Sequence, residues 1–360
     1  MRTFFLLALA LVTSMMANAQ GVITRQLNGQ SFFYYAGELQ QVFDDAETSI
    51  GQDTIILAGG QYVTSTDLFI RTPVVLVGSG LLTDSVTAYG GTTTISGSGF
   101  RYFSIMEDAD GTELHGIAFV GSIAVRLGTS VPTSDADDVF ISRCEITSLT
   151  IGSGSFGSLA NNALVEQCII TNLDLNECTD PTIRNCVIGS MGGGISTTNA
   201  QIEQCMFFNF ALNSNVGNEY TNCIFIRNQS SAFATNETDA IYRNNLFVGQ
   251  SGFSFTIGGV NATDAGGNVV DSPINTVNGA FPQLTSTSYT TFAHGDDYTP
   301  AAQWLTAGLG GTQVGIYGGA RPWKNGLLPF NPHWIELIAP STTVNGTLQG
   351  VQIKASAQQP

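Results

Sequence analysis

The feature that most constrains this chain is a cysteine that recurs about once every twenty residues. Five copies and one equivalent asparagine follow one another at spacings of 24, 18, 19, 18 and 22 residues: Cys144, Cys168, Cys186, Cys205, Cys223 and Asn245. An apolar or aromatic residue stands three positions before each of them and another stands two positions after. Repetition with a unit of this length is typical of a solenoid in which each unit forms one coil.

The spacing within each unit predicts strands and corners. The cysteine and the residue two positions later share one face of a strand, which we expect to point inward. The residue directly before the cysteine is always polar and is expected at a corner in the left-handed conformation. A second recurrent corner is predicted six positions before the cysteine, at Asp138, Asn162, Asp180, Asn199, Gly217 and Asp239. A helical repeat does not fit, because the apolar spacing never continues over several helical turns.

Stacking of the coils in register predicts free thiols rather than disulfides. It places successive Cβ atoms in parallel at about 4.8 Å, whereas a disulfide needs about 3.5–4.5 Å and converging Cα–Cβ bonds. Cys178 lies outside the repeat, so any disulfide that forms is expected to involve it. The thiols also lack the short Cys-x-x-Cys spacing of zinc sites, so no metal site is predicted.

The first residues have the features of a signal peptide. Arg2 provides a positive charge, residues 4–12 form a short apolar run, and residues 17–19 read Ala-Asn-Ala before Gln20. This pattern predicts cleavage after residue 19 and export, so we expect a secreted, cell-surface or periplasmic protein.

The rest of the chain divides by pattern into four parts. Leu39, Val42, Phe43 and Ala46 recur with the spacing of an amphipathic helix, which would cover the open end of the first coil. The predicted parts are an N-terminal cap at 20–50, a parallel β-helix at 51–290, a closing segment at 291–333, and terminal strands or a tail at 334–360.

Composition excludes two kinds of partner. The chain has 28 acidic and 12 basic residues and a formal charge of −16, so it lacks the basic surface that nucleic acid or anionic lipid requires. No apolar run after the signal peptide is long enough to span a bilayer. The composition indicates no particular oligomeric state.

The order of these features resembles the right-handed parallel β-helix superfamily, the pectate-lyase-like fold. The predicted cap helix is followed by DTIILAGGQY at 53–62, by VGSG at 77–80, and then by the repeated units. The glycine-rich stretch 308–319 and the stretch 321–333 resemble uncharacterised exported Bacteroidetes β-helix proteins. The resemblance implies an all-β, right-handed solenoid, and the superfamily includes pectate lyases and polygalacturonases.

Few residues are candidates for catalysis. Asp135 and Asp137 lie in the longest insertion between coils, where a solenoid places binding loops. His294 is followed by Gly-Asp-Asp and could act as an acid or base, and Arg143 could serve a β-elimination. His294 and Arg143 each have a structural interpretation too, a polar loop for His294 and a solvated corner for Arg143. A turn explains the neighbouring Asp138 but leaves Asp135 and Asp137 unexplained.

The candidates for ligand binding are aromatic. Trp304, Tyr317 and Trp323 gather near the C-terminal end of the repeat. They either pack against the solenoid as part of the closing segment or form a platform on which sugar rings stack.

The repeat accounts for nearly all of these residues without any reaction. We therefore expect an exported, non-enzymatic β-helix protein that binds a glycan or another extracellular partner and needs no cofactor. The alternative is a polysaccharide-active enzyme, either a lyase or a glycoside hydrolase, although the Gly-His-Gly and Arg-x-Lys signatures of polygalacturonases are absent. Calcium is expected only if the protein is a lyase.

Overall fold

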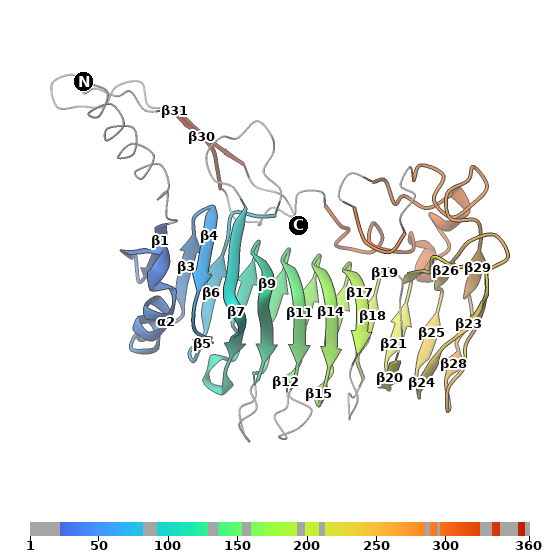
Figure 1. Ribbon diagram of the computed structural model, residues 1–360, viewed down its shortest axis with the longest axis horizontal. Helices are drawn as coiled ribbons and strands as arrows, with labels where there is room; N and C mark the ends of the chain where they lie inside the picture. Colours follow the sequence, from blue (N-terminus) through green and yellow to red (C-terminus); the bar gives the residue numbers. More distant parts are fainter. Residues whose placement is uncertain are drawn as a thin grey trace, which may run out of the picture.

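The protein forms a parallel β-solenoid of about 8 turns (Figure 1). The computed structural model describes residues 22–81, 92–128, 136–152, 160–192, 199–208, 213–284, 289–293, 296–324, 333–338 and 352–356. Two long sheets run along the solenoid, a 12-stranded sheet A and an 11-stranded sheet B.

Sheet A begins with the N-terminal hairpin of β1 and β2 and continues with strands from successive coils. In spatial order its strands are β2 (Gln30–Tyr35), β1 (Val22–Leu27), β3 (Asp53–Leu57), β6 (Val74–Val77), β8 (Glu113–His115), β10 (Phe140–Ser142), β13 (Leu164–Glu166), β16 (Thr182–Arg184), β18 (Gln201–Glu203), β21 (Glu219–Thr221), β25 (Ile241–Arg243) and β28 (Thr263–Asp264). β1 is antiparallel to both β2 and β3, and the later pairs are parallel.

Sheet B contains the longer strands. In spatial order these are β29 (Val269–Asp271), β26 (Leu246–Val248), β22 (Ile224–Ile226), β19 (Met206–Phe208), β17 (Val187–Gly192), β14 (Ile169–Leu175), β11 (Glu145–Ile151), β9 (Ala118–Leu127), β7 (Thr93–Ile105) and β4 (Gly60–Thr64), with β5 (Leu68–Ile70) also on β7.

Short pairs and helices complete the described elements. The parallel pairs are β12 (Ala160–Asn161) with β15 (Cys178–Thr179), β20 (Asn213–Val216) with β24 (Asn236–Thr238), and β23 (Ala232–Ala234) with β27 (Ser254–Thr256); β30 (His333–Ile338) and β31 (Gln352–Ser356) pair antiparallel. The helices are α2 (Leu39–Glu47) and the 3₁₀ turns η1 (Ala36–Glu38), η2 (Glu107–Ala109), η3 (Ala302–Trp304) and η4 (Leu309–Gly311).

The strand register confirms that like residues stack on like. The inward residue three positions before the cysteine pairs directly with its counterpart in the next coil, through Ile141, Val165, Ile183, Ile202, Tyr220 and Tyr242. The inward residue two positions after it does the same, through Ile146, Ile170, Ile188, Phe207, Phe225 and Phe247.

Both predicted corners adopt the left-handed conformation. Directly before the cysteine position, φ lies between 50° and 57° at Arg143, Gln167, Asn185, Gln204, Asn222 and Asn244. The second corner has φ of 53–56° at its Asp and Asn residues and 75° at Gly217. Side chains of this second corner also bond from coil to coil, since Asn162 Nδ2 donates to Asp138 Oδ1 at 3.1 Å. The interpretation of Asp138 as part of a turn ladder is confirmed.

The five cysteines of the repeat are buried and form no disulfide, as the stacking predicts. Cys178, which lies outside the repeat, is buried too and forms no disulfide. The peptide N–H of Cys144 donates to Cys168 Sγ at 3.4 Å, and beyond the thiols Cys223 N–H donates to Asn245 Oδ1 at 2.8 Å. Burial raises the pKa of Cys168 and Cys205, so these thiols stay protonated and unreactive.

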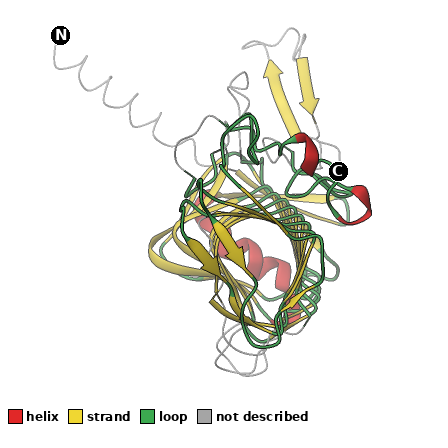
Figure 2. Ribbon diagram, turned by 90° about the vertical axis from the view of Figure 1, so that its right-hand side faces the viewer, coloured by secondary structure: helices red, strands yellow, loops and turns green. Residues whose placement is uncertain are grey.

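The predicted amphipathic helix forms at the N-terminal end. α2 buries Leu39, Val42, Phe43 and Ala46 in the core, as their spacing predicts. Viewed along the solenoid, the helix lies within the outline of the coils (Figure 2). Among the described residues, no helix has the length and apolarity needed to cross a membrane.

A C-terminal strap, residues 296–324, runs along the outer side of sheet B rather than across the end of the solenoid (orange in Figure 1). In the coils beneath it the strands are apolar on both faces, because Met206, Phe208, Ile224 and Ile226 point outward into a second core. Strap residues that pack in this core include Tyr298, Val314, Ile316 and Trp323.

Corner side chains from several coils form hydrogen bonds with the strap backbone. Asn244 Nδ2 donates to Ala307 O at 3.0 Å, and Asn222 Oδ1 accepts from Leu309 N–H at 2.7 Å. Asn185 Nδ2 donates to Ile316 O and Gly318 O, each at 2.9 Å, and Gln167 Nε2 to Pro322 O at 2.8 Å. Each of these corner residues thus has two roles: its backbone forms the turn, and its side chain binds the strap.

One carboxylate lies inside the solenoid itself. Glu237 is fully buried and accepts hydrogen bonds from the hydroxyls of Tyr220, at 2.8 Å, and Tyr242. Burial, together with the nearby Glu237 charge, raises the pKa of both tyrosines. The hydroxyls therefore remain donors at any ordinary pH.

Tyr242→Phe is expected to lower the free energy of unfolding by about 1.5–3 kcal/mol, because it removes a hydrogen bond to a charged buried group. Tyr62→Phe is the matched control, since the Tyr62 hydroxyl donates to the neutral carbonyl of Ala58 at 3.0 Å and should cost about 0.5–1.5 kcal/mol. Urea unfolding followed by tryptophan fluorescence measures both. Equal losses of unfolding free energy in the two variants would contradict the claim that the Tyr242–Glu237 hydrogen bond is stronger than the Tyr62–Ala58 one.

Candidate functional site

A row of polar side chains crosses the outer face of sheet A, one from each coil. The strand register places them next to one another in the order His115, Ser142, Glu166, Arg184, Glu203, Thr221 and Arg243. From Ser142 to Arg243, each stands two positions before the cysteine position, so the repeat itself generates most of the row.

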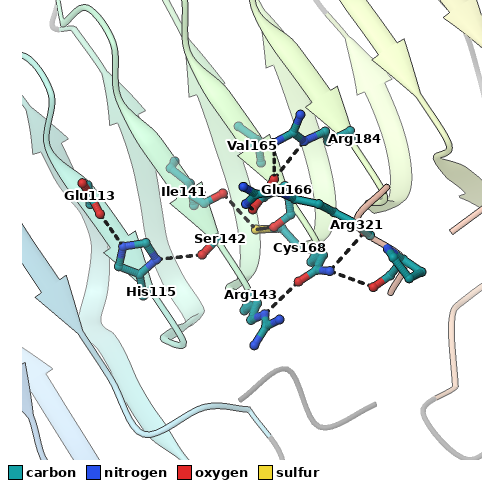
Figure 3. A network of polar contacts seen from close by, with 12 residues as sticks. Glu113, His115, Ile141, Ser142, Arg143, Val165, Glu166, Cys168, Arg184 and Arg321 are labelled. Carbon is teal, nitrogen blue, oxygen red and sulfur yellow. Dashed lines mark hydrogen bonds and ion pairs between the residues drawn. The ribbon is translucent and has the colours of Figure 1, made fainter. Parts of the chain in front are cut away.

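Glu166 is the third residue of this row, and both of its carboxylate oxygens are paired. Arg184 donates to Glu166 Oε2 from Nε and Nη2 at 2.8 and 2.6 Å, and Arg321 of the strap donates to Oε1 at 2.8 Å (Figure 3). The Glu166 side chain has no exposed surface. A buried carboxylate with both oxygens paired cannot reach a substrate, and its neutralisation by two arginines offsets the cost of burial.

His115 joins a serine and an acid, as in hydrolase triads. Its Nδ1 lies 2.7 Å from Ser142 Oγ and its Nε2 lies 2.8 Å from Glu113 Oε2 (Figure 3). A nucleophilic serine must reach a substrate carbonyl, yet Ser142 has no exposed surface. The arrangement therefore satisfies buried polar groups and does not form a reactive centre.

Arg143 is a buried corner residue rather than a solvated one. It has no exposed surface, and its Nε donates to Gln167 Oε1 at 2.7 Å. Burial lowers the Arg143 pKa to about 10; the Glu166 charge opposes this shift and the Arg321 charge adds to it. The expectation that Arg143 lies on a solvated corner is wrong, because the Arg143–Gln167 pair lies under the chain that Gln167 binds at Arg321 and Pro322.

The structure places Asp137 in a turn, away from Arg143. Asp137 Oδ1 accepts from the backbone N–H and the Nδ2 of Asn161 at 2.8 and 2.9 Å, and its own N–H donates to Asp110 Oδ1. Asp137 precedes β10 and Arg143 follows it, so the two lie at opposite ends of that strand. The candidates Asp135 and His294 lie outside the described residues.

The three aromatic candidates belong to the strap and its packing. Trp323 is 5% exposed within the second core, and Trp304 and Tyr317 pack partly buried against the same cluster. Trp304 Nε1 donates to Asp271 Oδ2 at 2.8 Å, which fixes the strap to β29. Burial raises the pKa of Tyr317, with a smaller contribution from the Asp297 charge.

A polar face that the sequence analysis missed lies beside the strap on sheet B. We define the open face by the outward residues in the C-terminal halves of β7, β9, β11, β14 and β17: Tyr102, Arg126, Ser148, Thr150, Asn172, Asp174 and Ser190. Each is at least partly exposed. The signal was available, because residues 148–151 and 172–175 alternate polar with apolar.

One end of the open face carries an aromatic and cationic cluster. The Arg126 guanidinium carbon lies 3.4 Å from the centroid of the Tyr102 ring. Phe100, which is 60% exposed, meets Tyr102 edge to face with centroids 5.0 Å apart. Stacking on Tyr102 restricts the guanidinium to one orientation and leaves the Phe100 ring accessible to a ligand.

Asp174 is the unusual residue of the open face. It is half-buried, and no described residue forms a hydrogen bond or ion pair with its carboxylate. Burial raises the Asp174 pKa. Its neighbour in the next coil is Gly192, where a Cβ atom would come within 2.5 Å of Asp174 Oδ1. A half-buried acid without a partner is a candidate for ligand binding or catalysis.

The open face combines groups suited to a hydroxyl-rich ligand. Thr150 separates Arg126 from Asp174, so the two charges are two strand spacings apart, roughly 10 Å. Among the described residues, no three His, Cys, Asp or Glu side chains are grouped to hold a metal ion. Comparison with family models, curated proteins and solved structures finds no match to this chain.

Asp174→Asn is expected to raise the melting temperature at neutral pH. A raised carboxyl pKa means that the folded chain binds the proton more tightly than the unfolded chain. Stability therefore falls as pH rises from the ordinary aspartate pKa of about 3.9 through the raised one. The gain from Asp174→Asn should be complete above the raised pKa and vanish below about pH 4.

Thermal unfolding across this pH range measures the effect, with Glu203→Gln on the opposite sheet as the control. Glu203 is exposed, so its replacement should leave the pH dependence unchanged. A melting temperature that falls at neutral pH in Asp174→Asn would mean that the carboxylate is stabilising and paired.

Proposed function

We propose that this chain is an exported, non-enzymatic β-helix protein that binds an extracellular glycan through the open face. In this proposal residues 1–19 are removed as a signal peptide, and the mature protein is secreted, periplasmic or on the cell surface. The solenoid winds right-handed as in the pectate-lyase-like superfamily and in exported Bacteroidetes proteins, and α2 closes its first coil.

The observation that carries the proposal is the carboxylate of Asp174, which has no partner among the described residues and lies within a row of hydroxyl and amide groups. By contrast, the buried acids Glu166 and Glu237 are paired inside the protein. Keeping a half-buried acid without a partner lowers stability, and such a cost is typical of functional positions. Glycan hydroxyls donate hydrogen bonds, and a carboxylate accepts them.

The remaining groups of the open face suit the other features of a sugar. Arg126 offers fixed donors to ring and hydroxyl oxygens, and the exposed Phe100 ring offers a surface for the apolar face of a sugar. Ser148, Asn172 and Ser190 form a row in which Ser190 Oγ bonds Asn172 Oδ1 at 2.6 Å. Because the row crosses the strands at about 4.8 Å per coil, an extended chain could contact several coils.

Binding without cleavage is favoured by the absence of a second acid in this group. Glycosidases use two carboxyl groups, about 5–5.5 Å or 6.5–9.5 Å apart. Asp174 is the single carboxylate among the seven residues that define the open face. A polysaccharide-active enzyme, lyase or glycoside hydrolase, remains the alternative, and the raised pKa of Asp174 favours it because such a group can act as a general acid. Calcium would be needed only for the lyase.

The test is calorimetric titration with a panel of neutral and uronic-acid oligosaccharides. We expect binding that weakens about tenfold or more in Asp174→Asn and in Phe100→Ala, since each removes a main contact. Glu203→Gln, on sheet A, should bind like the wild type. Binding that is equal in all four proteins would contradict a site on the open face.

The same oligosaccharides, incubated with and without calcium, distinguish binding from catalysis. Intact oligosaccharides are expected. New reducing ends would establish a hydrolase, and unsaturated products would establish a lyase. Loss of either activity in Asp174→Asn would then assign the acid role to that residue.

A further inference from the structure

The Asp174 carboxylate has no positively charged neighbour on the open face. Its strand neighbours in the adjacent coils are Thr150 and Gly192, and neither carries a charge. The one cation among the residues that define the open face is Arg126, which lies two strand spacings away, roughly 10 Å. The Arg126 guanidinium lies over the Tyr102 ring. The charge of Asp174 is therefore not neutralised by any residue that defines the open face.

An ammonium group suits this carboxylate better than a hydroxyl group does. Asp174 is half-buried, and its carboxylate has lost part of the water that would solvate its charge. A sugar ring that covers it removes more of that water. A hydroxyl group returns one hydrogen bond and leaves the charge in place, whereas an ammonium group donates a hydrogen bond and also neutralises the charge.

The charge of the whole chain favours the same class of ligand. The chain has a formal charge of −16, so it attracts positively charged polymers over long distances and repels negatively charged ones. A glycan of uronic acids that crossed the open face would also bring its own carboxylates toward Asp174, and like charges brought together across an interface disfavour binding. Long-range and local electrostatics therefore both favour a cationic glycan over an anionic one.

We propose that the glycan bound by the open face contains an amino sugar whose free ammonium group pairs with the Asp174 carboxylate. This inference rests on the proposed function, because it names the class of glycan that the same face binds. Arg126 repels a second ammonium group at its own end of the face, so the sugar there is uncharged. A glycan that carries both free and N-acetylated amino sugars meets both conditions.

A lysine-rich peptide also carries ammonium groups, but the open face suits a glycan better. The strands β9, β11 and β14 each have a hydrogen-bonded strand on both sides, so they offer no free edge to which a peptide strand could add. The face presents side-chain hydroxyl and amide groups instead, in Ser148, Asn172 and Ser190, together with the exposed Phe100 ring. These groups match the hydroxyls and the apolar ring faces of sugars.

Calorimetric titration with a matched pair of ligands tests the proposal. The ligands are a fully N-acetylated glucosamine hexamer and the same hexamer with part of its amines free. Because the two share one sugar backbone, the ratio of their affinities measures what the ammonium groups contribute. We expect the purified wild type to bind the hexamer with free amines about tenfold or more tightly at low salt. The ratio should shrink as added salt screens the charges.

Two variants test whether Asp174 is the residue that recognises the amine. Asp174→Asn removes the charge, and the affinity ratio should fall about tenfold. Gly192→Ala leaves the net charge unchanged, but its Cβ atom would come within 2.5 Å of Asp174 Oδ1 and so displaces the carboxylate; the ratio should fall here too. Glu203→Gln is the control, because it changes the net charge as Asp174→Asn does but is exposed on sheet A. It should keep the wild-type ratio.

Failure of this proposal can be distinguished from failure of the proposed function. Equal binding of the two hexamers by the wild type, with binding weakened in Phe100→Ala, would keep a glycan site on the open face but overturn the amino sugar. A ratio that falls equally in Asp174→Asn and Glu203→Gln would overturn it as well, because it would reflect only the net charge. Oligolysine that binds as tightly as the hexamer with free amines would favour a peptide and overturn it too. If neither the hexamers nor any other oligosaccharide binds, the proposed function fails with it.

Discussion

Backbone hydrogen bonding between successive coils in fixed register is the constraint on which the rest of the structure depends. It translates every side chain by one strand spacing, so each position must tolerate a copy of itself about 4.8 Å away. Aromatic rings meet this condition by stacking: Phe207 and Phe225 lie 4.7 Å apart at 9°, and Tyr220 and Tyr242 lie 5.0 Å apart at 13°. Small thiols also meet it without bonding covalently.

The same constraint separates structural chemistry from candidate functional chemistry. Groups that recur in every coil become ladders, and Glu166, which lies in a row that crosses the coils, is paired between Arg184 and Arg321. Residues that break the repeat are the candidates for function. Asp174 is a half-buried acid without a partner among the described residues. Reactive residue types in a solenoid therefore need to be judged by whether their column repeats.

Much of the coil could be predicted from the sequence, because stacking turns a spatial relation into a fixed sequence spacing. The left-handed corners at Asn185 and Asp138, the inward columns and the free thiols all follow from that spacing. The strap could not be predicted in the same way, since its contacts have no fixed sequence spacing: Asn244 and Ala307 are 63 positions apart, and Asn185 and Ile316 are 131 apart. The sequence signal for the strap was the pair of apolar residues that point outward in each of β19 and β22. The burial of Arg143 could not be predicted for the same reason. Its partner Gln167 is bound by residues 321 and 322, which are far away in the sequence.

Diffraction at long wavelength, which locates sulfur by anomalous scattering, tests parallel in-register stacking most directly. The account predicts five sulfur atoms in a nearly straight row, spaced by about 4.8 Å along the solenoid, with the Cys178 sulfur away from that row. Cysteine sulfur atoms that are scattered, or joined in pairs at about 2.05 Å, would contradict this prediction. Either result would mean that equivalent residues do not stack in columns. The account of the corners, the strap contacts and the open face depends on that stacking.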